Sequence, residues 1–551
     1  MPNDLIDILL SKRGITDPEE RRKFLNPSYE NGLHDPFLMR DMEKATVRVF
    51  EAMEAKEKIV IYSDYDCDGI PGAVILSDLL DICGYTNYEV YIPDRHDEGY
   101  GLHKDAVESF IKDGVTLIIT IDLGISAHEE VLLANSKGVD VIITDHHLCA
   151  GDAPEAFAIL NPKIDEYPYK MLCGSGVVFK FVQGFLFKYR EFYKIKEGWE
   201  KWMLDMAGLA TLSDMVPLLG ENRTIAYFGI QVLRKSKRLG FRELLKTIKL
   251  DQGALTEDDI AFSVTPKINA ASRLDTPRLS FELLKTKDPV RAKELATKLS
   301  SINDERKILV ALAVKEAKKK LKAKDIGNSI VIGDPSWRPG ILGLVASKIL
   351  DEHKIPVFVW GSDGEGLIKG SCRSGSIGVL DIMTGAKEAL VEYGGHHGAG
   401  GFATTKDLLH DLPMRIEESV KEILEKGIPD VETESDPQDA IVDLSNVSRR
   451  TYNNIDILSP FGFENPKPIF LFSGVTVVNV KHFGKMKDHL ELTLRDEYGE
   501  SVAIAFFKTS DSYNFKLENG VKLDLYGTLD LSNFRGYANI RIRIVDLCLS
   551  K

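Results

Sequence analysis

Acidic and histidine side chains come directly after three short apolar runs in the first half of the chain. KIVIYS is followed by DYDCDG, TLIIT by IDLG, and VIIT by DHH, while a fourth acid lies in TLSDMVPL. Carboxylate oxygens combined with imidazole nitrogens suit Mn²⁺ or Mg²⁺. Two such ions, ~3.5–4 Å apart, can activate a water and stabilise both oxygens of an in-line attack on phosphorus. The pattern therefore predicts a shared metal site for phosphodiester chemistry.

The same runs indicate the elements that must bring these side chains together. KIVIYS, TLIITID, VDVIITD and AFAILN are short, apolar and rich in Val and Ile, which is typical of buried parallel strands. Amphipathic segments at 126–137 and 174–188 predict helices. This alternation favours a doubly wound α/β sheet, whose carboxyl strand ends share one edge. Carboxylates that converge there repel one another, and a bound divalent cation usually neutralises their charges.

Each motif taken alone has a simpler interpretation. DYDCDG could be a calcium loop or a solvated turn, and a pair of histidines often lies in a turn. Their occurrence after successive predicted strands favours a single metal site. Cys67 and Cys149 are interpreted as small apolar fillers rather than ligands. The sequence has no HExxH motif or comparable closed set of His and Cys ligands, which argues against a zinc hydrolase.

Glycine, serine, arginine and histidine dominate two segments further along the chain. IKGSCRSG spans 368–375 and GGHHGAGGF spans 394–402. Glycines let backbone N–H groups approach a phosphate, and Arg and Ser add charge-assisted hydrogen bonds. We therefore expect a phosphate-binding loop with Arg373 and His396, the alternative being a glycine-rich turn at a strand–helix junction. Arg273, in PKINAASRL, is a further candidate phosphate clamp.

Length and composition limit the class of protein. A chain of 551 residues suggests roughly three or four domains. Its 70 Lys plus Arg against 84 Asp plus Glu give a net charge of −14, which argues weakly against a large nucleic-acid-coating surface but allows one enclosed groove. Six cysteines without a CxxC pair indicate neither a disulfide framework nor a zinc ribbon. With no signal-peptide pattern and no apolar run long enough for a membrane span, a cytoplasmic protein without membrane contact is expected.

Shifts in pattern predict the domain boundaries. A long basic segment at about 290–325 predicts a connecting helix, interpreted as solvated, with a groove-lining role for its lysines as the alternative. Successive strand patterns near the end predict a small barrel of the oligonucleotide-binding (OB) type. The predicted divisions are an N-terminal helical segment (1–45), a catalytic domain (46–287), the connecting helix (288–327), a phosphate-binding α/β domain (328–427), an acidic linker (428–439) and the barrel (440–551).

The motifs resemble a known family. DYDCDG, IDLG, TDHH and LSDMVP are similar to the signatures of the DHH phosphoesterase superfamily, and GSCRSG and GGHHGAGGF to those of its associated DHHA1 domain. RGITDPEERRKFLNPSYENGLHDPFLMRDMEKA, NAASR and PFGFENPKP further resemble the RecJ family of single-strand-specific exonucleases, nearly from end to end. The resemblance implies metal-dependent 5′→3′ degradation of single-stranded DNA in recombination and repair. It also implies a doubly wound DHH domain, a smaller α/β DHHA1 domain joined by a long helix, and a C-terminal OB barrel.

The resemblance also implies a role for individual residues. Two divalent ions, Mn²⁺ or Mg²⁺, would be held by Asp66, Asp68, Asp122, His146 and Asp214. Catalysis would involve His147, placed against the scissile phosphate or a second metal, together with Asp64 and Asp145. The DNA phosphates would be held by Asn269, Arg273, Arg338, Ser371, Arg373, Gly394, Gly395 and His396.

Basic and ring side chains in the predicted barrel are candidates for stacking on bases of a single strand. These candidates are Lys481, Phe483, Lys485, Phe534, Arg535 and Tyr537. Phe506 and Phe507, by contrast, are expected to fill the barrel interior.

Several positions depart from the family pattern, among them Leu123, where Cys or Asn is common, and Pro71-Gly72, which replaces small hydroxyl residues after the first motif. Tyr62 stands four residues before Asp66, where many relatives carry a histidine that helps to hold one metal, so the occupancy of that metal is in question. Ser272 replaces the usual glycine before Arg273, and Arg338 replaces a usual histidine. None of these changes removes a core ligand.

Two alternative functions stay open. A phosphodiesterase for oligoribonucleotides or cyclic dinucleotides would need only residues 45–427, so the remaining segments count against it. A non-enzymatic scaffold would lose motif carboxylates, whereas all four motifs keep theirs. The expected partners are single-stranded DNA, a helicase and a single-stranded-DNA-binding protein, with the protein itself a monomer.

Overall fold

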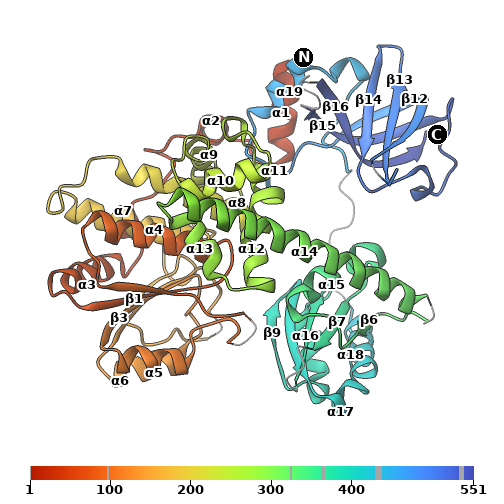
Figure 1. The fold of residues 1–551 in the computed structure, drawn as a ribbon. Helices are drawn as coiled ribbons and strands as arrows, with labels where there is room; N and C mark the ends of the chain where they lie inside the picture. Colours follow the sequence, from red (N-terminus) through yellow and green to blue (C-terminus); the bar gives the residue numbers. More distant parts are fainter. Residues whose placement is uncertain are drawn as a thin grey trace. The chain divides into compact units, whose positions relative to one another are not determined.

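The computed structural model in Figure 1 describes residues 2–95, 98–149, 151–322, 325–362, 367–427, 437–484, 486–532 and 539–550. The chain forms two compact units. The larger unit combines residues 35–214 and 229–433, and the smaller unit combines residues 1–34, 215–228 and 434–551. None of the helices in the described part of the chain is long and apolar enough to cross a membrane.

The larger unit contains the predicted parallel sheet. Its strands are β1 (Lys58–Ser63), β2 (Tyr88–Tyr91), β3 (Val115–Ile121), β4 (Asp140–Thr144) and β5 (Ala158–Leu160), in the order β2-β1-β3-β4-β5. Its surrounding helices are η1 (Pro36–Leu38), α3 (Met42–Glu54), α4 (Gly69–Ile82), α5 (Lys104–Lys112), α6 (His128–Ser136) and α7 (Gly174–Tyr189). Helices α4 and α7 cover one face and α5 and α6 the other, which explains why β1, β3 and β4 are mainly apolar (Figure 1). The predicted doubly wound sheet is confirmed.

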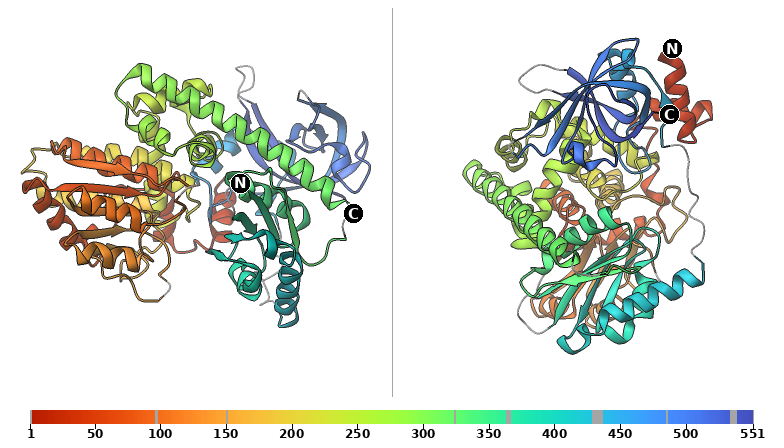
Figure 2. Two further views of the ribbon diagram at one scale, coloured as in Figure 1. Left: turned by 60° about the horizontal axis from the view of Figure 1, so that its bottom comes forward. Right: turned by 90° about the vertical axis from the view of Figure 1, so that its right-hand side faces the viewer.

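A helical layer follows the sheet. It consists of η2 (Trp199–Met203), α8 (Leu204–Ser213), the end of α9 (Gly220–Leu233, which begins in the smaller unit), α10 (Leu239–Thr247), η3 (Gln252–Ala254), α11 (Glu257–Asp259), the π-helical turn η4 (Ile260–Val264), α12 (Thr265–Leu274) and α13 (Arg278–Lys285). The long helix α14 (Pro289–Leu321) then packs on α10, α12 and α13, and further along on α15 (Figure 2). Its start is fixed by Pro289 in the first turn and by Asp288, whose side chain accepts a hydrogen bond from the N–H of Val290.

The second α/β part of the larger unit is mostly antiparallel. Its strands are β6 (Ile330–Gly333), β7 (Val357–Ser362), β8 (Ile368–Arg373), β9 (Glu392–His396) and β10 (Ala399–Thr404), in the order β6-β7-β8-β10-β9. Its helices are α15 (Pro339–His353), α16 (Val379–Gly385), η5 (Lys387–Ala389), α17 (Lys406–Leu409) and α18 (Leu412–Glu425).

The glycine-rich segment 394–402 is not the loop that its composition predicts. Most of it forms the hairpin β9–β10, in which Gly394 pairs with Gly401 and Gly395 with Gly400. A Cβ atom on Gly400 would lie 2.9 Å from the carbonyl oxygen of Gly394. The glycines therefore permit close approach of two strands, so the prediction of a loop was wrong.

The smaller unit contains the predicted barrel. Its strands are β11 (Ala440–Ile441), β12 (Phe470–Phe483), β13 (His489–Arg495), β14 (Glu500–Ala505), β15 (Lys522–Ser532) and β16 (Asn539–Leu549). Strand β12 pairs with both β13 and β15, and β14 with β16, which closes the barrel. Its helices are α1 (Pro2–Lys12), α2 (Pro18–Leu25), η6 (Leu444–Asn446), α19 (Arg449–Asp456) and η7 (Ser510–Ser512). Leu9, Leu10 and Phe24 of α1 and α2 share one hydrophobic core with the barrel.

Candidate metal centre and phosphate site

The hydrogen bonds between neighbouring strands of the parallel sheet extend one residue past the ends of β1, β3 and β4. The N–H of Asp64 donates to Ile121 O at 3.1 Å, that of Asp122 to Thr144 O at 2.9 Å, and that of Asp145 to Leu160 O at 3.1 Å. These bonds set three acids side by side at the carboxyl edge of the sheet. The convergence that the sequence predicts is therefore present.

Asp122 has an unusual backbone conformation. Its φ is +61°, in the left-handed region that costs a residue with a side chain about 1–3 kcal/mol. Helix α7 begins directly against it, since a Cβ on Gly174 would lie 2.7 Å from the Asp122 Cβ and 2.8 Å from its Oδ1. Strain of this kind concentrates at functional sites.

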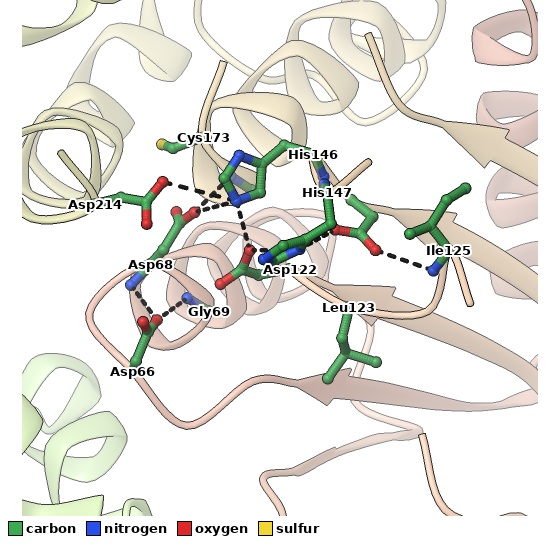
Figure 3. Close-up of polar contacts among 12 residues, drawn as sticks. Asp66, Asp68, Gly69, Asp122, Leu123, Ile125, His146, His147, Cys173 and Asp214 are labelled. Carbon is green, nitrogen blue, oxygen red and sulfur yellow. Dashed lines mark hydrogen bonds and ion pairs between the residues drawn. The ribbon is translucent and has the colours of Figure 1, made fainter. Parts of the chain in front are cut away.

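His146 lies at the middle of the acidic cluster (Figure 3). Its Nε2 is 3.1 Å from Asp122 Oδ1, 3.7 Å from Asp68 Oδ2 and 3.7 Å from Asp214 Oδ2. Three overlapping sets of side chains have ligand atoms close enough to share a metal ion: Asp122, His146 and His147; Asp68, His146 and Asp214; and Asp64, Asp66 and Asp122. The predicted ligands thus lie together.

Backbone N–H groups orient two of these carboxylates. Asp68 accepts hydrogen bonds from Gly174 N at 2.6 Å and Ser175 N at 2.7 Å, at the start of α7, where the helix dipole favours negative charge. Asp66 Oδ1 accepts from the N–H groups of Asp68 at 2.8 Å and Gly69 at 3.2 Å. The amino-terminal ends of α4 and α7 therefore hold the first motif in a fixed geometry.

The electrostatics of the cluster fit a bound cation. Burial, followed by neighbouring carboxylates, raises the pKa of Asp64, Asp122 and Asp214 well above the usual range, and that of Asp68 to about 6. Within the described part of the chain, Asp64 Oδ1 and Asp122 Oδ1 are buried and accept no hydrogen bond, although His146 Nε2 lies 3.1 Å from Asp122 Oδ1. Burial and the nearby His147 lower the pKa of His146 to about 3, so its ring is neutral and able to ligate.

His147 is oriented by Asp145. Asp145 Oδ1 accepts from the His147 N–H at 3.1 Å and lies 2.8 Å from its Nδ1, while Asp145 Oδ2 accepts from Ile125 N at 3.0 Å. Although burial opposes both shifts, this contact lowers the pKa of Asp145 and raises that of His147. Both carboxylate oxygens of Asp145 are therefore engaged in hydrogen bonds, and Oδ1 orients the His147 ring.

Two further rings contact His147. His396, on β9, stacks on it with ring centroids 5.8 Å apart and planes inclined by 9°. The Tyr100 hydroxyl lies 3.2 Å from His147 Nδ1 and donates to Asp122 O at 3.1 Å. The motif segments from both halves of the larger unit therefore meet at His147.

An arginine cluster lies beside the acids. Arg273 is partly buried, and burial, followed by the charges of its three neighbours Arg95, Arg306 and Arg373, lowers its pKa to about 9. Its Nη1 donates to Gly340 O at 3.2 Å, in the first turn of α15. The other three positive charges disfavour the charge on Arg273, so the cluster is suited to an anion.

The remaining predicted phosphate ligands vary in their surroundings. Arg373 Nη2 and Ser371 Oγ lie 2.8 Å and 3.5 Å from the place where a Cβ on Gly343 would be, so α15 passes close to both. Asn269 Oδ1 is buried without a partner among the described residues. Arg338 forms an exposed ion pair with Glu305 at 3.2 Å. Gly394 and Gly395 are exposed in β9.

Sequence reasoning missed Arg95, Tyr100 and Arg306. Arg95 and Tyr100 follow β2 and so come from the same edge of the sheet as the acids, a signal that IPDRHDEGYG carries. Arg306 is on α14, which was interpreted as a solvated helix with only its lysines as candidate groove residues. That interpretation was wrong for this turn, because Asn303 is fully buried and Arg306 is half-buried.

The barrel places Phe483 in an aromatic cluster. Its ring centroid is 5.1 Å from that of His489 and 6.0 Å from that of Phe506, while Arg541 and Arg543 lie over the Phe506 ring. Lys481 is paired with Glu491 at 2.8 Å. The candidates Lys485, Phe534, Arg535 and Tyr537 lie outside the described residues.

Phe506 and Phe507 do not fill the barrel interior, so that prediction was wrong. They are 38% and 80% exposed. Strand β14 ends at Ala505, and Phe507 takes a φ of +55°, which breaks the in–out alternation of the strand.

Comparison with known proteins decides the family. A model of the DHH family N-terminal domain matches residues 58–211, and a model of the RecJ OB domain matches residues 438–546. The single-stranded-DNA-specific exonuclease RecJ of Bacillus subtilis is 33% identical over 559 residues, which cover 99% of this chain and 68% of that protein. The chain belongs to the RecJ family. The RecJ protein of Haemophilus influenzae is 29% identical over 98% of this chain and 95% of its own length.

The RecJ fold is also confirmed in three dimensions. The crystal structure of RecJ from Thermus thermophilus in complex with Mn²⁺ superposes with a TM-score of 0.81 at 26% identity, covering 99% of this chain and 76% of that one. The parallel sheet, the second α/β part and the OB barrel thus form the architecture that the resemblance to the RecJ family implied.

Proposed function

We propose that this protein is an exonuclease that hydrolyses single-stranded DNA with Mn²⁺ or Mg²⁺ as cofactor. The observation that carries the proposal is the cluster of carboxylates and histidines at the carboxyl edge of the parallel sheet, in a chain of the RecJ family. Related proteins are named single-stranded-DNA-specific exonucleases, and one was crystallised with Mn²⁺. Hydrolysis of a phosphodiester is the chemistry that this set of side chains suits best.

Two ions are proposed to be held by Asp66, Asp68, Asp122, His146 and Asp214, with Asp122 shared between them. This assignment is supported by the short distances from His146 and by the buried carboxylate oxygens that have no other partner. Bound divalent ions supply a more acidic water and neutralise charge on phosphate oxygens.

His147 is proposed to contact the scissile phosphate. Asp145 accepts the proton on Nδ1, which leaves Nε2 as the ring nitrogen available to the substrate. The raised pKa of His147 keeps the ring cationic over a wider pH range, and a cation favours binding of the charged phosphate. Asp145 acts through His147, and Asp64 offers a buried carboxyl oxygen that has no hydrogen-bond partner among the described residues.

The arginine cluster is proposed to hold the terminal phosphate of the strand. Arg95, Arg273, Arg306 and Arg373 supply several positive charges beside the metal ligands. A terminal phosphate carries more negative charge than an internal phosphodiester, so a strand with a 5′-phosphate and a 3′-hydroxyl would bind here by its 5′ end, which favours 5′→3′ digestion. Arg338, Ser371, Asn269, Gly394, Gly395 and His396 are proposed to contact the phosphates that follow.

The OB barrel is proposed to bind more distant nucleotides, through the ring cluster that includes Phe483 and Phe506. Since the enzyme acts on single strands, it requires a partner that exposes them, and a helicase and a single-stranded-DNA-binding protein meet that need in recombination and repair. We propose that the protein acts as a monomer, because one chain supplies all of the proposed metal ligands. We accordingly propose a cytoplasmic location.

A pair of end-labelled oligonucleotides tests the function. Single-stranded DNA labelled at the 5′ or 3′ end is incubated with the protein and Mn²⁺, Mg²⁺ or EDTA, and a duplex serves as the control substrate. We expect immediate release of labelled mononucleotide from the 5′ label alone, with either metal and not with EDTA. Mononucleotide released first from the 3′ label would contradict the proposed direction, and equal digestion of the duplex would contradict the substrate class.

A further inference from the structure

Tyr62 occupies the position where relatives with this pattern carry a metal-binding histidine, yet its side chain is directed elsewhere. It is fully buried in β1, and its hydroxyl donates to Gly101 O at 3.0 Å. Its ring stacks on Tyr91 of β2, with centroids 5.2 Å apart and planes inclined by 23°. The hydroxyl proton is thus given to a backbone carbonyl.

Tyr91, Asp94 and Glu98 form a small hydrogen-bonded network near this contact. Tyr91 donates to Glu98 Oε1 at 2.6 Å, and Glu98 Oε2 accepts from Asp94 N at 2.7 Å. The residues on either side of Tyr100 are Gly99 and Gly101, with φ values of +89° and +113°. Only glycine adopts such values without strain, so the backbone turns sharply on both sides of Tyr100. Tyr91 fixes the segment on one side of this turn and Tyr62 on the other.

Tyr100 extends from this turn into the metal site. Its hydroxyl donates to Asp122 O at 3.1 Å and lies 3.2 Å from His147 Nδ1. Its ring meets the His147 ring edge-on, with centroids 5.8 Å apart. It therefore contacts both the strained backbone of Asp122 and the nitrogen by which Asp145 holds His147.

We propose that Tyr62 is a positioning residue for this site: its hydroxyl fixes Gly101 and so aims Tyr100 at Asp122 and His147. Tyr62 takes no part in holding metal. The kinetic consequence rests on the proposed nuclease function, whereas the contact between Tyr100 and His147 does not. Small displacements of the groups at a reacting centre reduce the rate strongly, because a shift of about 1 Å can lower turnover on the order of 10²-fold.

Three variants of the full-length protein test the proposal: Tyr62→Phe, Tyr100→Phe and the double variant. Each keeps its ring and loses only a hydroxyl. Tyr88→Phe is the matched control, since Tyr88 lies on the adjacent strand β2 and its hydroxyl donates to Asp81 at 2.7 Å, away from the metal ligands. Turnover of a short 5′-phosphorylated strand is measured at saturating Mn²⁺, and Mn²⁺ affinity is measured separately by calorimetry.

We expect Tyr62→Phe to lower kcat on the order of 10-fold, with KM and the Kd for Mn²⁺ changed by less than about two-fold. The double variant should be no slower than Tyr100→Phe, because both hydroxyls act through one contact. Tyr88→Phe should retain normal kcat. Three results would each overturn the proposal. They are additive losses of kcat in the double variant, an equal loss of kcat in Tyr88→Phe, and a Tyr62→Phe defect confined to Mn²⁺ affinity.

A readout without turnover separates this proposal from the nuclease function. In protein with ¹⁵N-labelled histidine, Tyr62→Phe and Tyr100→Phe should move the His147 Nδ1 resonance in the same direction, and Tyr88→Phe should leave it in place. A wild-type protein that fails to cut single-stranded DNA would refute the proposed function, and this comparison would still decide the role of Tyr62. An unchanged His147 resonance in Tyr62→Phe would refute that role.

Discussion

At the scale of single residues, the buried acids make the metal-free protein sensitive to pH. Burial and Asp66 raise the pKa of Asp68 from 3.8 to about 6, so the folded protein keeps a proton that the unfolded chain releases at lower pH. Protons therefore favour the folded state, and this contribution to stability is lost as the pH rises from about 4 to about 6. The raised pKa values of Asp64, Asp122 and Asp214 act in the same direction.

A bound ion removes this repulsion and competes with the protons. We expect Mn²⁺ to raise the melting temperature more at about pH 7.5 than at about pH 5, because at low pH protons already neutralise the carboxylates. Thermal melting in Mn²⁺ and in EDTA at the two pH values measures the difference. An increase in Tm that is the same at both values would show that the carboxylates are not coupled to the metal.

Phosphate binding by Arg373 predicts a change in salt dependence. Arg373→Ala should weaken binding of single-stranded DNA and reduce the slope of log K against log salt by ~0.7, the value for one lost phosphate contact. Arg415→Ala is the control, because Arg415 is a surface residue paired with Glu388 at 3.0 Å. Fluorescence anisotropy over a salt series in Ca²⁺ measures both. An unchanged slope in Arg373→Ala would mean that Arg373 stabilises the end of β8 and does not contact a DNA phosphate.

At the scale of elements, the start of α7 is a sensitive point of the metal centre. Gly174→Ala would place a Cβ 2.7 Å from the Asp122 Cβ. It would also displace the backbone N–H of residue 174, which donates a hydrogen bond to Asp68. We expect a loss of activity on the order of 10²-fold and weaker Mn²⁺ binding, because a small displacement of ligands is costly. Gly176→Ala, in the same helical turn, is the control, since its Cβ would meet its nearest neighbour at an ordinary 3.5 Å. Equal activity in the two variants would contradict the packing that positions Asp122.

The elements differ in how far the sequence determines them. Strands β1, β3 and β4 were predictable because a strand buried on both faces is apolar throughout, and the acids after them follow from the geometry of a parallel sheet. The hairpin β9–β10 was not, since glycine is common both in loops and in closely spaced strands. Phe507 was mispredicted because its left-handed backbone breaks the alternation, and neighbouring residues do not indicate that change. The position of Arg306 beside the site was not predictable, because it depends on how α14 packs against distant parts of the chain.

At the scale of the whole molecule, two segments distant in sequence join the barrel. Residues 1–34 and 215–228 belong to the same compact unit as the barrel. Arg223 donates to the carbonyl oxygens of Phe24 at 2.9 Å and Leu458 at 2.9 Å, which ties these segments together. No local pattern reveals such contacts, because the partners lie hundreds of residues apart. A truncation at the linker would therefore expose Leu9, Leu10 and Phe24, and point variants are the better test of the barrel.

The exposed ring cluster of the barrel predicts a length-dependent effect. Phe506→Ala combined with Phe507→Ala should weaken binding of long strands on the order of 10-fold or more, because stacking is worth ~1–3 kcal/mol per base. Hydrolysis of very short oligonucleotides should be unchanged. Tyr498→Ala is the control, an exposed ring in the turn between β13 and β14. Affinity and turnover measured over a series of strand lengths test this division, and a uniform loss at all lengths would contradict it.

The central claim is that the acidic cluster performs the hydrolysis of single-stranded DNA. Asp122→Asn tests it most directly, since asparagine tolerates the left-handed backbone and removes only the charge of the ligand proposed to be shared by both metals. Asp113→Asn, an exposed acid at the end of α5, is the control. With Mn²⁺ and a 5′-phosphorylated strand, we expect Asp122→Asn to lose on the order of 10³-fold or more in kcat while it melts as the control does. Near-normal turnover in Asp122→Asn would contradict the two-metal site.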